Sequence, residues 1–249
     1  MEKDVIRDFN TEAQSLPHKQ YQYQYDHIVR DYMFRSFESF FRSGSALELG
    51  CYEGDTAVVL SRYFNDLTVV DASSKALAIA EPRLPIGTTI INSTFEEISA
   101  VSSFMNIFAI NVLEHVDEAL PVLEKIRSLL APGGRVFLVV PNADAPSRQI
   151  AVKMGIIPYN NAVTPSEWEH GHRRTYSFDT LHQDIRAAGL NIIHSGGLLF
   201  KPLANFQLDR ALESGIIDMR FIEGTYLLGM EYPQLCSSIF SICEDNSYA

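Results

Sequence analysis

The stretch ALELGCYEGDTAVVL, residues 46 to 60, decides the fold of this chain. Its first four residues, 46–49, favour a short buried strand, and a helical pattern begins at Asp55. Between the two, Gly50 and Gly54 predict a tight turn. Such a turn exposes backbone N–H groups and the positive end of a helix to the polar groups of a ligand.

The same alternation of strand and helix continues along the chain. The predicted strands are 46–49, 67–71, 89–92, 105–110 and 135–140, and the predicted helices between them are 55–63, 74–84 and 117–130. A helix at 178–188, a strand near 191–194 and an apolar run at 238–243 complete seven predicted strands. This order predicts an α/β fold: a doubly wound, mostly parallel seven-stranded sheet with helices on both faces.

The predicted organisation is one domain over residues 1–249, with three additions to the sheet. An amphipathic run favours an N-terminal helical cap within residues 1–44. Two insertions are predicted, at the proline-rich residues 143–176 and at an irregular stretch over 201–235. Both are expected to lie over the pocket of the substrate that the protein acts on.

The composition narrows the class of protein. Hydrophobic residues make up 46% and charged residues 20%, which is typical of a globular domain. The net charge of −11 disfavours nucleic acid as a partner. Three cysteines without a CxxC pair, no long apolar run and no signal-peptide pattern predict a cytoplasmic protein that has no contact with a membrane.

Asp71 closes the second predicted strand about 20 residues after the glycine turn, where an acidic side chain can accept hydrogen bonds from ribose hydroxyls. The turn and this carboxylate together predict a nucleoside site. Tyr52 stands where the dinucleotide fingerprint needs a glycine for close approach of a pyrophosphate, so NAD is disfavoured. An oxidoreductase on a similar sheet and a non-catalytic cofactor-binding module remain alternatives, because fold alone does not set function.

Four segments in register carry a resemblance to a known family. ALELGCYEG and VVDAS resemble the first two motifs of the class I S-adenosylmethionine-dependent methyltransferases, and NVLEHV and LLAPGGRVFLVVPN are similar to the regions of their fourth and fifth strands. HGHRRTYSFDTLHQDIRAAGL resembles the segment before the sixth strand in the ubiquinone-type and glycan-modifying branches. The resemblance implies S-adenosylmethionine as cofactor and methyl transfer as reaction.

The family pattern also implies which residues surround the cofactor. They are Glu48, Gly50, Cys51 and Gly54 at its methionine end, Asp71 and Ala72 at the ribose, Thr94, Phe95 and Glu96 at the adenine, and Asn111 and Val112 on the floor. Tyr52 departs from the glycine of many members, which puts the shape of the turn in question.

Two histidines are candidates for a catalytic base. His115 follows the fourth predicted strand at the edge where open α/β sheets place ligands, and His172 lies at the end of the first insertion. Some relatives bind a divalent metal through a Glu-x-x-Glu-His run, but Asn111 occupies its first position here. No metal site is therefore predicted.

The expected reaction is methyl transfer from S-adenosylmethionine to a small-molecule or sugar-like acceptor, at a hydroxyl, with an amine as the nearest variant. The acceptor pocket is predicted between three groups of residues: the tyrosines Tyr21, Tyr23 and Tyr25, the insertion with Tyr159 and Trp168, and the stretch after Lys201.

Overall fold

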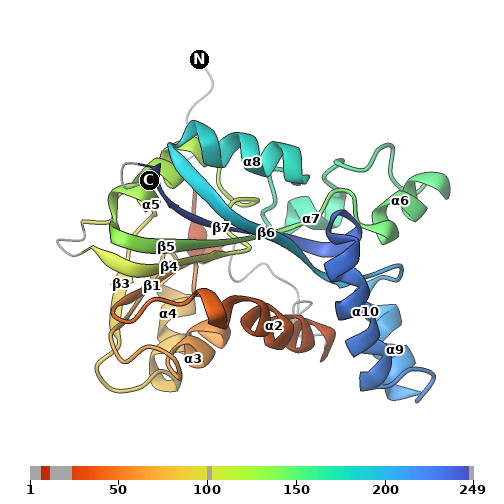
Figure 1. Ribbon diagram of the computed structural model, residues 1–249, viewed down its shortest axis with the longest axis horizontal. Helices are drawn as coiled ribbons and strands as arrows, with labels where there is room; N and C mark the ends of the chain where they lie inside the picture. Colours follow the sequence, from red (N-terminus) through yellow and green to blue (C-terminus); the bar gives the residue numbers. More distant parts are fainter. Residues whose placement is uncertain (1–6, 12–23, 100–102, 247–249) are drawn as a thin grey trace.

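The computed structural model describes residues 7–11, 24–99 and 103–246, and these contain one seven-stranded sheet (Figure 1). Its strands are β1 (Ala46–Leu49), β2 (Leu67–Asp71), β3 (Thr89–Asn92), β4 (Phe104–Ile110), β5 (Leu130–Pro141), β6 (Leu190–Phe200) and β7 (Cys236–Asp245). Their order is β3-β2-β1-β4-β5-β7-β6. All neighbours are parallel except β7, which runs antiparallel to both β5 and β6. The predicted fold class is confirmed.

Helices cover both faces of this sheet (Figure 1). One face carries α2 (Gln24–Phe37), α3 (Asp55–Leu60) and α4 (Ser74–Ala80), and the other carries α5 (Ala119–Ser128) and α8 (Phe178–Ala187). Each layer has its own apolar core: Phe37 and Leu60 belong to the first, and Leu123 and Ile185 to the second. Short 3-10 turns complete the order: η1 (Glu38–Phe40), η2 (Glu81–Arg83) and η3 (Pro233–Leu235).

Two predicted element boundaries are wrong at glycines. Gly133 and the proline before it lie inside β5, whereas the sequence predicts that they follow the end of a helix. Strand β6 extends well beyond the predicted 191–194 and includes Gly196. A Cβ at Gly196 would lie 2.6 Å from Cζ of Phe240, so here glycine leaves room for a ring on the neighbouring strand.

Both predicted insertions contain helices. Residues 143–176 include α6 (Pro146–Lys153) and the single turn α7 (Pro165–Glu169). The stretch 201–235 is not irregular as predicted, because it forms α9 (Asn205–Glu213) and α10 (Met219–Glu231). Only a narrow side of α9 and of α10 is buried, where Leu208 of α9 and Ile222 and Tyr226 of α10 pack against α2.

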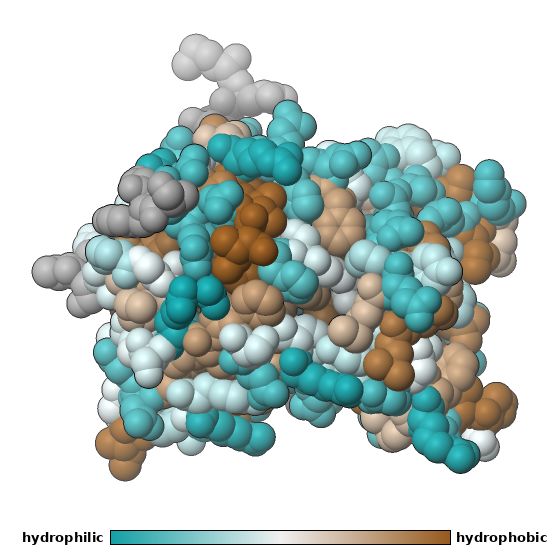
Figure 2. Space-filling model, viewed as in Figure 1, coloured by the Kyte–Doolittle hydropathy of each residue, from teal (hydrophilic) through white to brown (hydrophobic). Residues whose placement is uncertain are grey.

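Large exposed apolar side chains explain why the helical period of 201–235 is hard to read. Phe206, Met219, Phe221, Leu227 and Met230 are all more than two fifths exposed. Figure 2 shows hydrophobic groups at the end of the molecule where α6, α9 and α10 lie. Because apolar residues occur on the exposed sides as well, the sequence shows no clean amphipathic stripe. No helix in the described ranges combines the length and the apolar character that a membrane crossing requires.

Candidate active site

The turn between β1 and α3 has a backbone that favours glycine. Gly50 has φ of 72°, and a Cβ there would lie 2.9 Å from Cγ2 of Val112. Tyr52 has φ of 47°, the left-handed region in which non-glycine residues are uncommon. The tyrosine thus adopts a backbone conformation that glycine adopts readily, so the turn forms with a tyrosine at this position. Backbone conformations of this kind concentrate at functional sites.

Asp71 is held by the turn on one side and by its own strand end on the other. Its Oδ2 accepts a hydrogen bond from the backbone N–H of Tyr52, and its Oδ1 accepts one from Ser73, both at 2.8 Å. Desolvation raises the pKa of Asp71, and these two backbone donors act against that shift. The carboxylate is therefore fixed in position at the carboxyl end of β2 without any ligand.

A cavity of about 580 Å³ runs along the carboxyl ends of the central strands. Twelve of the thirteen predicted site residues line it: Glu48, Gly50, Cys51, Asp71, Ala72, Thr94, Phe95, Glu96, Asn111, Val112, His115 and His172. Gly54 does not. It precedes α3 with φ of 85°, and a Cβ there would lie 3.1 Å from Cβ of Ala80, so it lets α3 approach α4.

Glu48 lies almost fully buried on β1 and lines the cavity. Desolvation raises its pKa to about 8, although Arg30 of α2 acts in the opposite direction. Its Oε2 has no hydrogen-bond partner among the described residues. A cationic group in the cavity would satisfy this oxygen and favour the carboxylate form. Arg30, which the sequence did not point to, also lines the cavity and lies 3.8 Å from Asp55.

Two histidine side chains meet at the other end of the cavity. The rings of His115 and His172 have their centroids 4.6 Å apart, nearly edge to face. Desolvation, with the neighbouring His172 and Arg7, lowers the pKa of His115 to about 3, and desolvation also lowers the pKa of His172. Both imidazoles are therefore neutral near neutral pH, the form that can accept a proton.

The fold brings these histidines together through two backbone hydrogen bonds. The N–H of Arg173 donates to the carbonyl of Glu114 at 2.7 Å, which attaches the end of the insertion to the residues after β4. The N–H of His172 donates to the carbonyl of Glu167 at 2.9 Å. His115 and His172, 57 positions apart in the sequence, thus share one wall.

Glu114 adds a buried carboxylate to this wall. Neither of its carboxylate oxygens has a hydrogen-bond partner in the part of the chain that the structure describes, and desolvation raises its pKa to about 8. One ligand atom from each of Glu114, His115 and His172 lies within 4.8 Å of the others. An oxygen and two imidazole nitrogens could hold a divalent cation. The sequence predicts no metal because of Asn111; the structure supplies His172 as a third donor instead.

Some of the residues predicted around the acceptor line the cavity and others do not. Tyr25 and Lys201 line the cavity, but Tyr159 and Trp168 are each 59% exposed and do not. The Trp168 ring instead lies against the guanidinium of Arg173, whose Cζ is 4.7 Å from the ring centroid. Tyr21 and Tyr23 lie outside the described residues.

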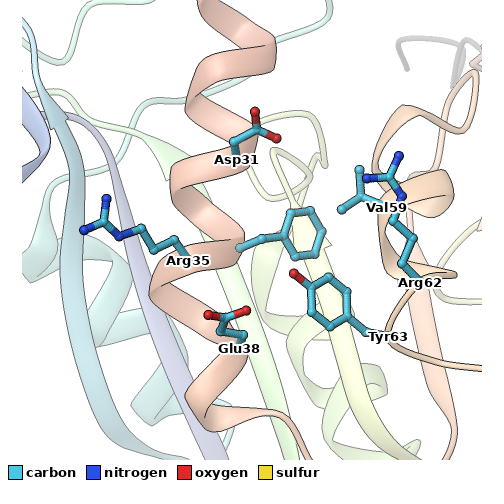
Figure 3. A pocket seen from close by; sticks show the side chains of 7 residues that line it. Asp31, Arg35, Glu38, Val59, Arg62 and Tyr63 are labelled. Carbon is cyan, nitrogen blue, oxygen red and sulfur yellow. The ribbon is translucent and has the colours of Figure 1, made fainter. Parts of the chain in front are cut away.

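A second, smaller hollow lies between α2 and α3 (Figure 3). Its volume is about 240 Å³, and the rings of Phe34 and Tyr63 stack on its floor with their centroids 5.7 Å apart. None of the predicted site residues lines it. The predicted site residues instead line the larger cavity.

A family model described as a methyltransferase domain matches residues 18–195. The chain belongs to the class I S-adenosylmethionine-dependent methyltransferases. It is accordingly an enzyme of methyl transfer with S-adenosylmethionine as its cofactor.

Two ubiquinone biosynthesis O-methyltransferases are 26% and 30% identical to this methyltransferase over the aligned residues. The ubiquinone biosynthesis O-methyltransferase of Paracidovorax citrulli is 26% identical over 173 residues, 63% of this chain and 67% of that protein. The protein of the same name from Paraburkholderia phymatum is 30% identical over 165 residues, 63% of this chain and 68% of that protein.

Solved structures share the fold at lower sequence identity. The N-methyltransferase NodS of Bradyrhizobium japonicum, in complex with S-adenosyl-L-homocysteine, superposes with a TM-score of 0.62 at 12% identity, over 94% of this chain and 96% of its own. A possible histamine N-methyltransferase of Thermotoga maritima gives the same score at 14% identity, over 94% and 99%.

Proposed function

We propose that this enzyme transfers the methyl group of S-adenosylmethionine to a hydroxyl of a small-molecule acceptor. The observation that supports this most is a single cavity lined by Glu48 and Asp71 as well as by His115 and His172. The O-methyltransferase names of the relatives agree with a hydroxyl acceptor. The three buried free cysteines favour a reducing, cytoplasmic location.

The cofactor fits the residues around the glycine turn. The carboxylate of Glu48, with an oxygen that lacks a hydrogen-bond partner among the described residues, suits the ammonium of the methionine part. Asp71 suits the two ribose hydroxyls, and Phe95 with Thr94 suits the adenine. When bound, the cofactor supplies an electrophilic methyl group that the acceptor oxygen displaces, with S-adenosylhomocysteine as leaving group.

His172 is the proposed base for the acceptor hydroxyl. Its imidazole is neutral near neutral pH and can take the proton that the oxygen loses as the new C–O bond forms. His115 is the weaker base of the two because its pKa is lowered to about 3. Alignment of the two reactants contributes besides, on the order of 7 kcal/mol in favourable cases.

A divalent cation is the second way to activate the hydroxyl, and the donor set fits one. Glu114, His115 and His172 would hold it, and it would supply a Lewis acid that lowers the pKa of the acceptor. Metal analysis of the purified wild type and of Glu114→Gln, which lacks a charged ligand, distinguishes activation by a histidine base from activation by a divalent cation. Bound metal that is lost in Glu114→Gln, together with loss of turnover in a chelator, favours the cation.

The experiment that tests the function is incubation of the pure enzyme with labelled S-adenosylmethionine and a fractionated metabolite extract, followed by mass spectrometry of the labelled product. An O-methyl product is expected. His172→Ala should then lower kcat about 100-fold with little change in the Kd of S-adenosylhomocysteine. His182→Gln is the matched control, since His182 bonds to Ser195 away from the cavity.

Full turnover in both His172→Ala and His115→Ala would exclude a histidine base and leave alignment as the mechanism. An N-methyl product would correct the acceptor atom and leave the cofactor site untouched.

A further inference from the structure

We propose that Lys201 binds a carboxylate group of the methyl acceptor and so orients the acceptor in the cavity. The proposal rests on the proposed function, and it names the class of small molecule that the same site takes. It begins from a charge in the cavity wall that hydrogen-bonds to a neutral amide, while the carboxylate of Asp26 acts on it from beyond that amide.

Three lysine or arginine side chains line the cavity among the described residues. Arg7 lies 4.0 Å from a carboxylate oxygen of Asp117, and Arg30 lies 3.8 Å from one of Asp55. Lys201 instead donates to the amide oxygen of Asn205, and the nearby Asp26, which attracts its charge, hydrogen-bonds to the other side of that amide. A cation removed from water in this way gains from an anion that enters the cavity.

The surroundings of Lys201 fix the position of its ammonium group. Its Nζ donates to Oδ1 of Asn205 at 2.5 Å, and the ring centroid of Tyr25 lies 5.5 Å from the same atom. Nδ2 of Asn205 donates to Oδ1 of Asp26 at 2.9 Å, so the amide is oriented with its oxygen toward the lysine. An ammonium group has three N–H donors, and Asn205 is the single hydrogen-bond acceptor that the described residues offer it.

The elements that carry this group are themselves tied together. Asp209 of α9 accepts hydrogen bonds from the backbone N–H groups of Gln24 and Tyr25 at 3.0 and 2.9 Å. The carbonyl of Lys201 accepts from the N–H of Ser147, the second residue of α6, at 3.3 Å. Lys201 is therefore held between α2, α9 and α6, as a binding residue must be.

Lys201 and His172 line the same cavity and are connected through α6. The N–H of Ser147 donates to the carbonyl of Lys201, and the guanidinium of the next residue, Arg148, donates to the carboxylate of Glu167. The carbonyl of Glu167 in turn accepts a hydrogen bond from the N–H of His172. An acceptor whose carboxylate meets Lys201 thus lies in the cavity that His172 lines.

The charge of this region favours a carboxylate over a phosphate. Lys201 is the one lysine of the cavity, and Asp26 and Glu114 line the same cavity. A single positive charge beside acidic groups balances the one negative charge of a carboxylate better than the roughly two negative charges of a phosphate. The groups that face the ammonium from the packed elements are Tyr25 and Asp26 of α2 and Arg148 of α6.

Binding to protein saturated with S-adenosylhomocysteine tests this directly. The probes are matched pairs that differ only in carboxylate against carboxamide: 3,4-dihydroxybenzoate with its amide, glucuronate with its amide, and 3-hydroxybutyrate with its amide. At least one acid should bind about 10-fold more tightly than its amide, as expected for a charge-assisted hydrogen bond. The preference should vanish in Lys201→Met and persist in Lys153→Met, an exposed lysine of α6.

The pH dependence is a second readout that a purely structural lysine would not give. The pKa of Lys201, lowered mainly by desolvation, lies at about 8, so the ammonium loses its charge as the pH rises through that value. The preference for the acid should therefore fall between about pH 7 and about pH 9.5 in the wild type and should be absent at both in Lys201→Met.

Four results would overturn the proposal. The first is that no acid binds more tightly than its amide, the second is that the preference for the acid survives in Lys201→Met, and the third is that a phosphate ester outcompetes every acid. The fourth is that Lys201→Met binds S-adenosylhomocysteine more weakly while its preference for the acid is unchanged. The last would assign Lys201 to the carboxylate of the cofactor. Because S-adenosylhomocysteine binding is measured first and methyl transfer is not required, failure here leaves the proposed O-methylation to its own test.

Discussion

Asp71 is the residue whose loss should affect the cofactor most. It accepts two backbone hydrogen bonds at 2.8 Å and offers its remaining lone pairs to the cavity. Asp71→Asn and Asp71→Ala should weaken S-adenosylhomocysteine binding by about 10- to 100-fold, because a charge-assisted hydrogen bond to each ribose hydroxyl is lost. Titration calorimetry measures this, with the exposed Asp66→Asn as control. Equal affinities in Asp71→Ala and wild type would place the ribose elsewhere.

Because of Glu114, the free energy of unfolding of the ligand-free protein should fall as the pH rises. Desolvation raises its pKa in the fold from 4.5 to about 8, so the folded protein keeps a proton that the unfolded chain releases. Its contribution to stability is full below pH 4.5 and is lost as the pH rises toward about 8. Between about pH 5 and about pH 8, the free energy of unfolding should fall more in the wild type than in the isosteric variant Glu114→Gln. The difference between the two decreases should exceed about 1 kcal/mol.

Urea unfolding at these pH values gives the comparison, and Glu97→Gln, an exposed site, is the control.

The histidines change the free energy of unfolding with pH in the opposite direction. The pKa of His115 is lowered to about 3, so its contribution is present above pH 6.5 and is lost as the pH falls below that value. A parallel pH profile for Glu114→Gln and wild type would mean that the Glu114 carboxyl already carries its charge at pH 5.

Single residues near strand ends were predictable from the sequence, and residues supplied by distant elements were not. Glu48 and Asp71 lie on or directly after short apolar strands, so their place at one sheet edge follows from parallel pairing. Arg30 lies on α2, and nothing in the local pattern indicates which strand end that helix crosses. The meeting of Glu114 with His172 likewise depends on how the insertion folds back.

Among the elements, α6 and α7 depend on one arginine. Nε of Arg148 donates to the carbonyl of Asn160 at 2.7 Å, and its terminal nitrogens donate to the carbonyl of Ala162 and to the carboxylate of Glu167. Arg148→Met should lower the free energy of unfolding by about 1 to 3 kcal/mol, because buried acceptors lose their partner. It should also lower kcat while the Kd of S-adenosylhomocysteine stays unchanged, since the insertion positions the proposed base His172.

Limited proteolysis within 143–176 reports the same loosening, and Arg186→Met on the exposed side of α8 is the control. A variant with the kcat of the wild type would show that His172 keeps its place without the Arg148 contacts.

Elements with short apolar runs bounded by turns were predicted well, and helices with apolar residues on several sides were not. β1, β2 and β3 have the predicted bounds because short apolar runs between turns leave few alternatives. α9 and α10 were missed because their apolar residues lie on exposed as well as buried sides, so only packing on α2 reveals the helical surface.

For the molecule as a whole, the net charge of −11 bears on which acceptors can approach. A nucleic acid carries a phosphate charge at every step, and binding it releases one counterion for nearly every phosphate neutralised. A net negative charge repels such a polyanion on average, whereas one lysine in a cavity is enough for a single carboxylate. The charge of the chain therefore disfavours a polyanion, and the contacts of Lys201 favour a small acid.

The dependence of acceptor binding on salt distinguishes these two kinds of acceptor. For a small acid held by one ammonium group, log KM should change with log salt concentration by a slope of about 1 or less; a polyanion that contacts several phosphates gives a slope of about 0.9 for each. The measurement is turnover on the identified acceptor over a series of potassium chloride concentrations, with tRNA and duplex DNA assayed in parallel. Methylation of either polymer faster than any small metabolite, together with a steep slope, would contradict the prediction, because it would require a basic surface on an acidic chain.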